Sequence, residues 1–359
     1  MKLDKLQRGL LYLCLALTGC ASQPVLHVQH VDFGGSIWSA NQRQAGVIFQ
    51  DWAQSTTLPG GSIWTFGDTF IGQPQPGRPP QNPQITGMIG NTIAFLPAGE
   101  TNLPPRLIYF TNALGMATTP LTIFPEEPAA TNRIWPLGGI SIGSRGYLFY
   151  SMIEMTDGTA PWNFRGTGAG LAVSDQPMQH FTRLRPDGRW QFPVEPVQVI
   201  REGIWLYLYE ISACPKGLIL ARVPVAKIEN PKAYVFLTGQ GWSTNRAQAK
   251  VILREAYGQV SVVWNARWSR YLMATSSDFS HPQEIQLREA ARPEGPWSPP
   301  LRIAIPEMPG KKTSLIYCAF LHPELSDDQA LRYVATYCRT LAGDWELTNP
   351  EWLTITLEP

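Results

Sequence analysis

The chain has 359 residues, of which 44% are hydrophobic and 16% are charged, and its formal net charge is +1 at pH 7. This composition supplies enough apolar sequence for a full core, and the small net charge excludes the strongly basic surface typical of nucleic-acid-binding proteins.

The first part of the chain is typical of an export signal. Three basic residues precede a short apolar run over residues 10–17. Such a run is too short to form a stable membrane-spanning helix, whereas a cleaved signal has this organisation. We therefore predict a signal peptide over residues 1–19 and a mature domain over residues 20–359.

The end of this segment resembles a bacterial lipobox. Its residues are Leu17, Thr18, Gly19 and Cys20, so Cys20 would be lipidated and would become the first mature residue. Ala21 at the next position resembles lipoproteins sent to an outer membrane. The predicted location is thus a lipid anchor in the outer membrane, facing the periplasm or the cell surface. The alternative is an ordinary secretory signal with an incidental cysteine.

The remaining chain consists of short β-rich runs. Almost no segment has the apolar spacing of an amphipathic helix, and the 32 prolines and 31 glycines separate the runs as turn residues. In chain order the runs cover residues 45–50, 63–66, 91–96, 106–111, 146–152, 168–174, 203–208, 217–223, 259–265, 270–275, 315–320, 331–337 and 352–357. We predict an all-β fold in a single domain.

The runs fall into hairpin-like groups, which favours a five-bladed β-propeller over a sandwich. Five groups begin near Val31, Ile134, Trp190, Gly241 and Trp297, and no strict repeat of the WD40 type is visible. The last run, residues 352–357, is expected to close the ring beside strands near the mature N-terminus, because an unpaired edge would promote aggregation.

The cysteines do not form a metal-binding pattern. The mature chain has Cys214, Cys318 and Cys338 beyond Cys20, with no C-x-x-C pair, so a zinc site is not expected. Cys318 and Cys338 lie on neighbouring predicted strands, where a disulfide and two buried free thiols are equally good interpretations. We predict no cofactor. A structural calcium ion in the channel is compatible with a propeller, although the sequence shows no ligand set for it.

Two acids and an amide stand at strand ends early in the chain. Asp51 follows the run over residues 45–50, Asp68 ends the next strand between glycine and threonine, and Asn91 opens the run over residues 91–96. In a propeller the inner strands end in a common funnel, so such side chains can converge. The alternative for Asp68 is a turn-capping role through nearby backbone amides.

These residues also carry a family resemblance. Gln50-Asp51, residues 58–61 and residues 64–72 resemble bacterial five-bladed propellers with glycosidase-like relatives, some of which are endo-D-arabinanases. Weaker similarities follow at residues 90–92, 135–139, 254–255, 295–298, 317 and 322–324. The chain departs from the family pattern at Trp52, where a glycine is expected, so the shape of the pocket beside Asp51 is open.

The resemblance implies an acid pair for glycoside hydrolysis. Such an enzyme needs two carboxyl groups, about 6.5–9.5 Å apart for inversion or about 5–5.5 Å apart for retention. Asp51 would be the ionised base or nucleophile, and Asp68 would orient substrate or tune the pKa of its neighbour. Glu255 would be the general acid, with Glu154 in reserve. The alternative for these glutamates is a solvated strand end.

Aromatic residues supply candidate sugar platforms. The chain has 13 tryptophans, and a flat indole covers the apolar face of a sugar ring. Trp52, Trp135 and Trp242 lie in predicted loops and are the stacking candidates, whereas most others are expected to pack between blades. The candidates for hydrogen bonds to the substrate are Asn91, Tyr317 and His322, the last of which is equally suited to anchoring a loop.

Together these features predict an exported, lipid-anchored and monomeric glycosidase-like enzyme. Its substrate would be a furanose-containing, arabinan-like or other bacterial surface polysaccharide. The alternative is a propeller that binds a glycan or a protein without cleavage. Two acids facing one pocket, one of them with a raised pKa, would favour the enzyme.

Overall fold

The computed structural model describes residues 26–73, 84–157, 163–177, 180–276, 283–329, 331–341 and 349–358. The signal segment and Cys20 lie outside these ranges. The prediction of an all-β fold is confirmed, because the described residues form β-strands with one short α-helix, α1 (Ala40–Gln44). No helix in the described ranges has both the length and the apolar character needed to cross a membrane.

The first part of the chain forms two small sheets. One has the strand order β3-β4-β7-β8 and the other has the order β2-β5-β6. Their strands are β2 (Val47–Gln50), β3 (Gln54–Leu58), β4 (Gly61–Phe66), β5 (Thr69–Gln73), β6 (Gln84–Ile89), β7 (Thr92–Pro97) and β8 (Ile108–Tyr109).

Two further sheets follow in chain order. The first of these sheets has the order β12-β11-β10-β9, with β9 (Asn132–Ile142), β10 (Arg145–Met155), β11 (Phe164–Ser174) and β12 (Thr182–Arg183). The third has the order β13-β14-β15-β16-β17, with β18 paired to β15. Its strands are β13 (Gln198–Glu202), β14 (Trp205–Ala213), β15 (Lys216–Pro224), β16 (Val235–Thr238), β17 (Gly241–Ser243) and β18 (Val251–Leu253).

The last two sheets complete the molecule. One contains β19 (Tyr257–Asn265), β20 (Arg270–Ser276), β21 (Glu284–Ala290) and β22 (Leu301–Ala304) in sequential order. The other has the order β1-β25-β24-β23, with β1 (His27–Ser36), β23 (Thr313–Leu321), β24 (Arg332–Leu341) and β25 (Glu351–Glu358). Short 3₁₀ turns are η1 (Pro186–Gly188), η2 (Val225–Lys227), η3 (Pro231–Ala233), η4 (Arg246–Gln248) and η5 (Pro323–Leu325).

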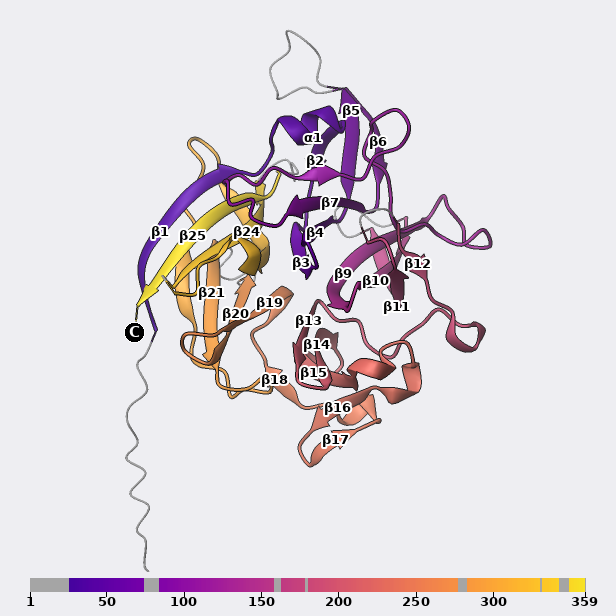
Figure 1. The fold of residues 1–359 in the computed structure, drawn as a ribbon, viewed down its shortest axis with the longest axis vertical. Coiled ribbons are helices and arrows are strands. Elements are labelled where there is room, and N and C mark those ends of the chain that lie inside the picture. Colours follow the sequence, from indigo (N-terminus) through magenta and orange to yellow (C-terminus); the bar gives the residue numbers. More distant parts are fainter. Residues whose placement is uncertain are drawn as a thin grey trace, which may run out of the picture.

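The sheets surround a common centre, toward which β3, β9, β13 and β19 lie in Figure 1. These strands contact one another in sequence: β3 contacts β9, β9 contacts β13, β13 contacts β19, β19 contacts β23, and β23 contacts β3. The ends of these strands, although far apart in sequence, are therefore neighbours in space.

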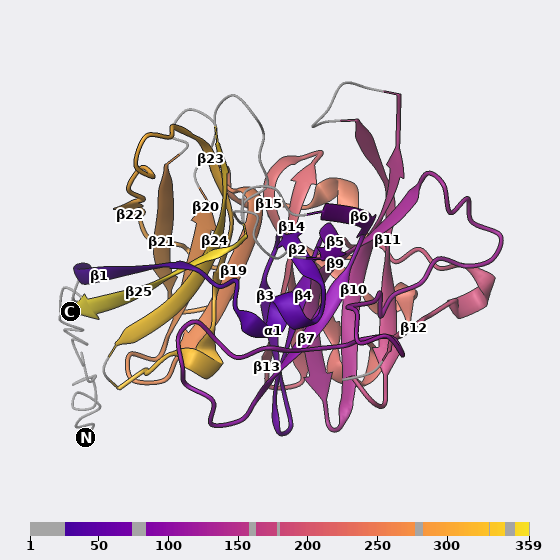
Figure 2. The same ribbon diagram turned by 90° about the horizontal axis from the view of Figure 1, so that it is seen from above.

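The two ends of the described chain meet in one sheet. Strand β1 pairs antiparallel with β25, from His27 opposite Glu358 to Ser36 opposite Glu351, and Figures 1 and 2 both show the two strands side by side. The predicted pairing of the last run with a strand near the mature N-terminus is confirmed. This pairing leaves neither terminal strand with both edges free.

Three of the predicted group boundaries are wrong. Val31 lies in β1, which belongs to the last sheet, Gly241 lies in β17 of the third sheet, and Trp297 lies between β21 and β22 of the next sheet. The physical reason is that the third sheet carries an additional short hairpin, β16–β17, and loops of unequal length separate the sheets. Even spacing along the sequence therefore does not mark where one sheet ends.

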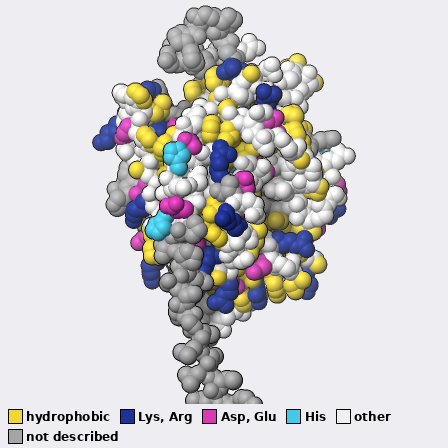
Figure 3. Space-filling view, turned by 60° about the vertical axis from the view of Figure 1, so that its left-hand side comes forward, with side chains coloured by type: hydrophobic (Ala, Val, Ile, Leu, Met, Phe, Trp, Pro, Cys, Tyr) yellow, Lys and Arg dark blue, Asp and Glu magenta, His cyan; other side chains and the backbone are white. Residues whose placement is uncertain are grey.

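The core lies between the sheets. Strand β14 buries side chains on both of its faces, since Leu206 and Leu208 alternate with Tyr207 and Tyr209 and all four are buried. Burial of this apolar surface is the main force that holds the sheets together. On the face of the molecule shown in Figure 3, acidic and basic side chains are interspersed, in keeping with the small net charge.

Candidate functional site

The structure brings Asp51 and Asp68 together. Asp51 lies between β2 and β3, and Asp68 lies in the two-residue connection between β4 and β5. The backbone N–H of Gly67 donates to the carbonyl oxygen of Asp51 at 3.1 Å. A Cβ atom at position 67 would come within 2.5 Å of Asp51 Oδ1, so a side chain there would displace the Asp51 carboxyl from its position.

The pKa of the Asp51 carboxyl lies close to neutral pH. Burial, followed by the negative charge of Asp68, raises the pKa of Asp51 from 3.8 to about 7. The hydroxyl of Tyr317, on β23, donates to Asp51 Oδ2 at 3.3 Å and opposes this rise. A substantial fraction of Asp51 is therefore protonated at pH 7, which makes the group a proton donor.

The Asp68 carboxyl has partners that favour its ionised form. Burial raises its pKa, while a hydrogen bond from Trp135 and the positive charge of Arg133 lower it. Trp135 Nε1 donates to Asp68 Oδ1 at 3.0 Å. Burial outweighs these partners, so the pKa of Asp68 is raised as well. The negative charge of Asp68 further raises the pKa of Asp51, against hydrogen bonds from Tyr317 and two backbone amides, so the protonated form is favoured at Asp51.

Arg133 is a site residue that the sequence analysis missed. Arg133 and Trp135 are two positions apart on β9, so their side chains project from the same face of the strand. The Nε atom of Arg133 is buried and has no hydrogen-bond partner within the described ranges. This two-residue spacing beside a predicted sugar platform is the signal that identifies Arg133 from sequence.

The chain between Asp51 and β3 has an uncommon backbone. Trp52 and Ala53 have φ angles of 80° and 59°, in the left-handed region that favours glycine. Trp52 is 7% exposed, its Nε1 donates to Gln54 at 3.1 Å, and its ring packs on Phe320. The predicted role of Trp52 as a loop platform is therefore wrong: its indole is a core group that stabilises the turn carrying Asp51.

The hydrogen-bonding groups of the Asn91 side chain are all occupied by partners within the protein. The amide nitrogen of Asn91 donates to the carbonyls of Leu121 and Ile134, and its oxygen accepts from Thr119 and the backbone of Leu121. Asn91 is 3% exposed and has no capacity left for a substrate. Its predicted role in substrate binding is wrong, because the side chain instead joins the loop that contains Leu121 to strand β9.

His322 is likewise a structural residue. It is completely buried, its ring stacks on Trp64 with centroids 4.0 Å apart, and its two nitrogens contact Ser55 and Thr336 at 2.9 and 2.8 Å. These contacts join β23–β24 to β3. Of the two interpretations of His322, the structure supports the loop anchor rather than the sugar contact.

The contacts of the other predicted residues do not include Asp51 or Asp68. Trp242 is in β17, where its ring packs against Arg222 at 4.1 Å. The carboxylate of Glu255 is 69% exposed and pairs with Arg288 at 3.3 Å. Glu154 accepts two hydrogen bonds from Arg165, at 2.9 and 2.8 Å, at the end of β10. None of these contacts joins them to Asp51 or Asp68.

The cysteines in the described ranges are free thiols. Cys318 and Cys338 are buried free thiols, so of the two interpretations of this pair the free form is observed. The described ranges hold no group of three His, Cys, Asp or Glu side chains arranged to bind a metal ion.

The comparisons with known proteins agree with this fold. A family model described as a domain of unknown function, DUF4185, matches residues 41–340. The chain belongs to this family. A search of curated proteins finds no match to the chain.

Three solved structures show the same fold at low sequence identity. A protein from Bacteroides ovatus ATCC 8483 proposed to be a hydrolase has a TM-score of 0.67 at 17% identity, over 88% of this chain and 87% of that one. The RS223 β-xylosidase has a TM-score of 0.50 at 9% identity, over 87% and 95%. An exo-β-1,3-galactanase from Phanerochaete chrysosporium has a TM-score of 0.50 at 10% identity, over 90% and 64%. The fold is thus the propeller-like all-β fold also found in glycoside hydrolases.

Proposed function

We propose that the protein is a glycoside hydrolase in which Asp51 and Asp68 are the catalytic pair. The observation that carries this proposal is the meeting of two carboxyl groups in one site, with the pKa of Asp51 raised to about 7. A pair of carboxyls whose environments separate their roles is what glycoside hydrolysis requires.

In this mechanism Asp51 donates its proton to the glycosidic oxygen as the bond to the anomeric carbon breaks. Asp68, held by the Trp135 indole, remains ionised and either attacks the anomeric carbon or takes a proton from the attacking water. From the sequence, the ionised role is expected at Asp51 and the donor role at Glu255. We assign the donor role to Asp51 instead, because its surroundings favour the protonated form.

The ring of contacts among β3, β9, β13, β19 and β23 supports a five-bladed propeller, with one of these strands at the inner edge of each blade. The three-stranded sheet of β2, β5 and β6 would then be an addition beside the first blade. It supplies one end of each connection that carries Asp51 and Asp68.

The proposed substrate is a furanose-containing, arabinan-like or other bacterial surface polysaccharide. The family resemblance of the Asp51 and Asp68 segments supports this class, as does the partly exposed Trp135 beside the acid pair. We also propose that residues 1–19 are removed and that Cys20 is lipidated, which would hold a monomeric enzyme at the outer membrane. A structural calcium ion remains a prediction.

The test is hydrolysis by the protein without residues 1–19, with Cys20→Ser to omit the anchor, on a panel of bacterial polysaccharides that includes D-arabinan. We expect product release by this protein and a loss of at least about 100-fold in Asp51→Asn and in Asp68→Asn. The matched control is Asp187→Asn, which changes an exposed aspartate paired with Lys232. Equal rates in all four proteins would contradict the assigned site.

The second candidate function is a glycan-binding module without catalysis. The partly exposed Trp135 ring beside the acids favours it, since an aromatic platform alone suffices to bind sugar. Retained binding of one glycan in calorimetry, without cleavage by the unsubstituted protein, would support the binding module over the enzyme.

A further inference from the structure

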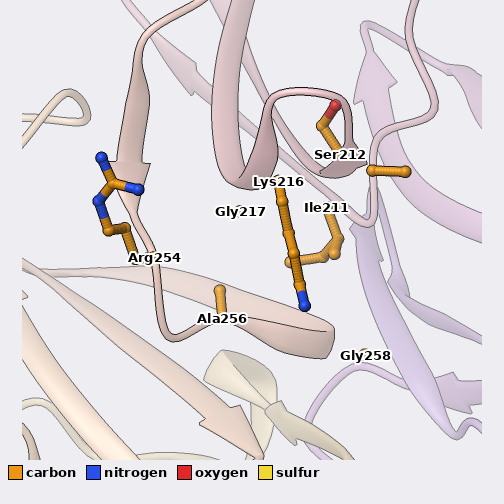
Figure 4. Close-up of a pocket in the computed structure, with 8 residues that line it drawn as sticks. Ile211, Ser212, Lys216, Gly217, Arg254, Ala256 and Gly258 are labelled. Atoms are coloured by element: carbon orange, nitrogen blue, oxygen red, sulfur yellow. The ribbon is translucent and has the colours of Figure 1, made fainter.

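A cavity of 320 Å³ opens between two segments of the third and fourth sheets (Figure 4). One wall is the hairpin between β14 and β15, and the other is the segment that joins β18 to β19. The lining residues are Ile211, Ser212, Ala213, Lys216, Gly217, Arg254, Ala256 and Gly258. Its volume is at the lower end of the range for small-molecule sites, about 300–1,000 Å³.

The charged residues that line this cavity are both cations. Lys216 extends toward the segment carrying Ala256 and Gly258, and Arg254 flanks the cavity on the other side (Figure 4). Neither side chain forms an ion pair within the described part of the chain. The adjacent acid, Glu255, faces Arg288 instead at 3.3 Å, so it does not neutralise the lining.

The nearby pair of Glu210 and Arg246 is internally neutral. Arg246 contacts the Glu210 carboxylate and also donates to the hydroxyl of Ser212, a lining residue. These contacts fix Ser212 without adding net charge. The remaining lining is apolar or glycine, including Ile211 and Ala256, which suits the C–H face of a sugar ring.

A short chain of contacts connects the cavity to the acid pair. Tyr317 donates to Asp51, and the backbone N–H of its neighbour Cys318 donates to Gln259 Oε1 at 3.0 Å. Gln259 directly follows Gly258, a lining residue. The cavity and the acid pair are therefore linked through the neighbouring strands β19 and β23.

We propose that this cavity is a subsite for an anionic group of the glycan, carried as a carboxylate or as a sulfate or phosphate ester. Arg254 presents a planar fork that matches such oxyanions, and Lys216 adds a point charge. The inference rests on the proposed glycosidase function and narrows its substrate class to acidic polysaccharides. The two cations would position the charged sugar while Asp51 and Asp68 act on an adjacent linkage.

The test is calorimetric binding to the Asp51→Asn protein, in which the probe is not consumed. The probes are oligogalacturonides for a carboxylate, chondroitin sulfate oligosaccharides for a sulfate ester, phosphomannan oligosaccharides for a phosphate ester and neutral xylo-oligosaccharides for comparison. We expect an acidic probe to bind at least about tenfold more tightly than the neutral one, with an affinity that falls as salt rises. The probe that binds identifies the anionic group.

Variants of the two cations separate a specific subsite from general attraction. Added to the Asp51→Asn background, Lys216→Gln and Arg254→Gln are each expected to weaken the acidic probe about tenfold and leave the neutral probe unchanged. The matched control is Lys227→Gln, an exposed lysine in η2, beyond the opposite end of β15. Equal binding of acidic and neutral probes, or equal losses in the control, would overturn the subsite.

These outcomes are separable from the test of the glycosidase itself. Hydrolysis of a neutral glycan at a rate unaffected by Lys216→Gln, with no acid-specific binding, would retain the enzyme and overturn the subsite. Acid-specific binding that depends on Lys216 and Arg254, without any hydrolysis by the unsubstituted protein, would support the subsite and contradict the catalytic role of the acid pair.

Discussion

Replacing Asp51 by asparagine is expected to stabilise the fold at neutral pH while abolishing activity. The raised pKa means that the folded protein disfavours the Asp51 carboxylate. The rise from 3.8 to about 7 is about three pKa units, which at about 1.36 kcal/mol per unit amounts to about 4 kcal/mol. Asparagine has a similar shape and no charge, so it removes this cost.

The sign of the pH dependence follows from proton binding. Between pH 3.8 and about 7 the folded state holds the Asp51 proton more tightly than the unfolded state does, so the wild-type protein loses stability as pH rises and then levels off. At pH 4 the cost is nearly absent, because Asp51 is protonated in the fold. The advantage of Asp51→Asn should therefore grow by up to about 4 kcal/mol between pH 4 and pH 8.

Urea denaturation of both proteins at pH 4, 6 and 8 measures this difference. We expect the midpoint of Asp51→Asn to exceed that of the wild-type protein at pH 8 by more than it does at pH 4. The exposed variant Asp187→Asn should show no such gain, since Asp187 is paired with Lys232 at the surface. A difference between Asp51→Asn and wild type that does not change with pH would refute the reasoning that burial and Asp68 hold the Asp51 proton.

Three other substitutions test the surroundings of the pair. Tyr317→Phe removes a hydrogen bond that lowers the pKa of Asp51, so the basic limb of the kcat/KM profile should move to higher pH. Trp135→Phe removes the donor that lowers the pKa of Asp68, so the acidic limb should move to higher pH; an unchanged limb would argue against Asp68 as the ionised partner. Gly67→Ala places a methyl group within 2.5 Å of Asp51 Oδ1, so kcat should fall at least about tenfold while circular dichroism stays unchanged, and full activity would contradict the close approach.

The strand content and the acid pair could be predicted from local sequence. Turn residues separate β-rich runs, and this pattern reports backbone preference directly. Asp51 and Asp68 stand beside strands close together in the chain, so their meeting depends on one small part of the fold. Whether Cys318 and Cys338 form a disulfide could not be predicted, because the sequence places them on neighbouring strands in either case.

The roles that the sequence left open or assigned wrongly depend on packing. His322 and Asn91 carry polar groups suited to a substrate, yet their partners come from distant segments that saturate them. Trp52 replaces an expected glycine, and its burial follows from a backbone turn that sequence does not display. Glu255 has a family-like context, but its carboxylate is exposed and faces Arg288.

The titration of the Asp51 carboxyl by difference infrared spectroscopy tests the central claim most directly. We expect a protonated-carboxyl band that persists at pH 6, disappears with a midpoint about pH 7, and is absent from Asp51→Asn. In Asp68→Asn the midpoint should move to lower pH, because a neighbouring negative charge is removed. An Asp51 carboxyl that is already ionised at pH 6 in the wild-type protein would contradict its role as the proton donor.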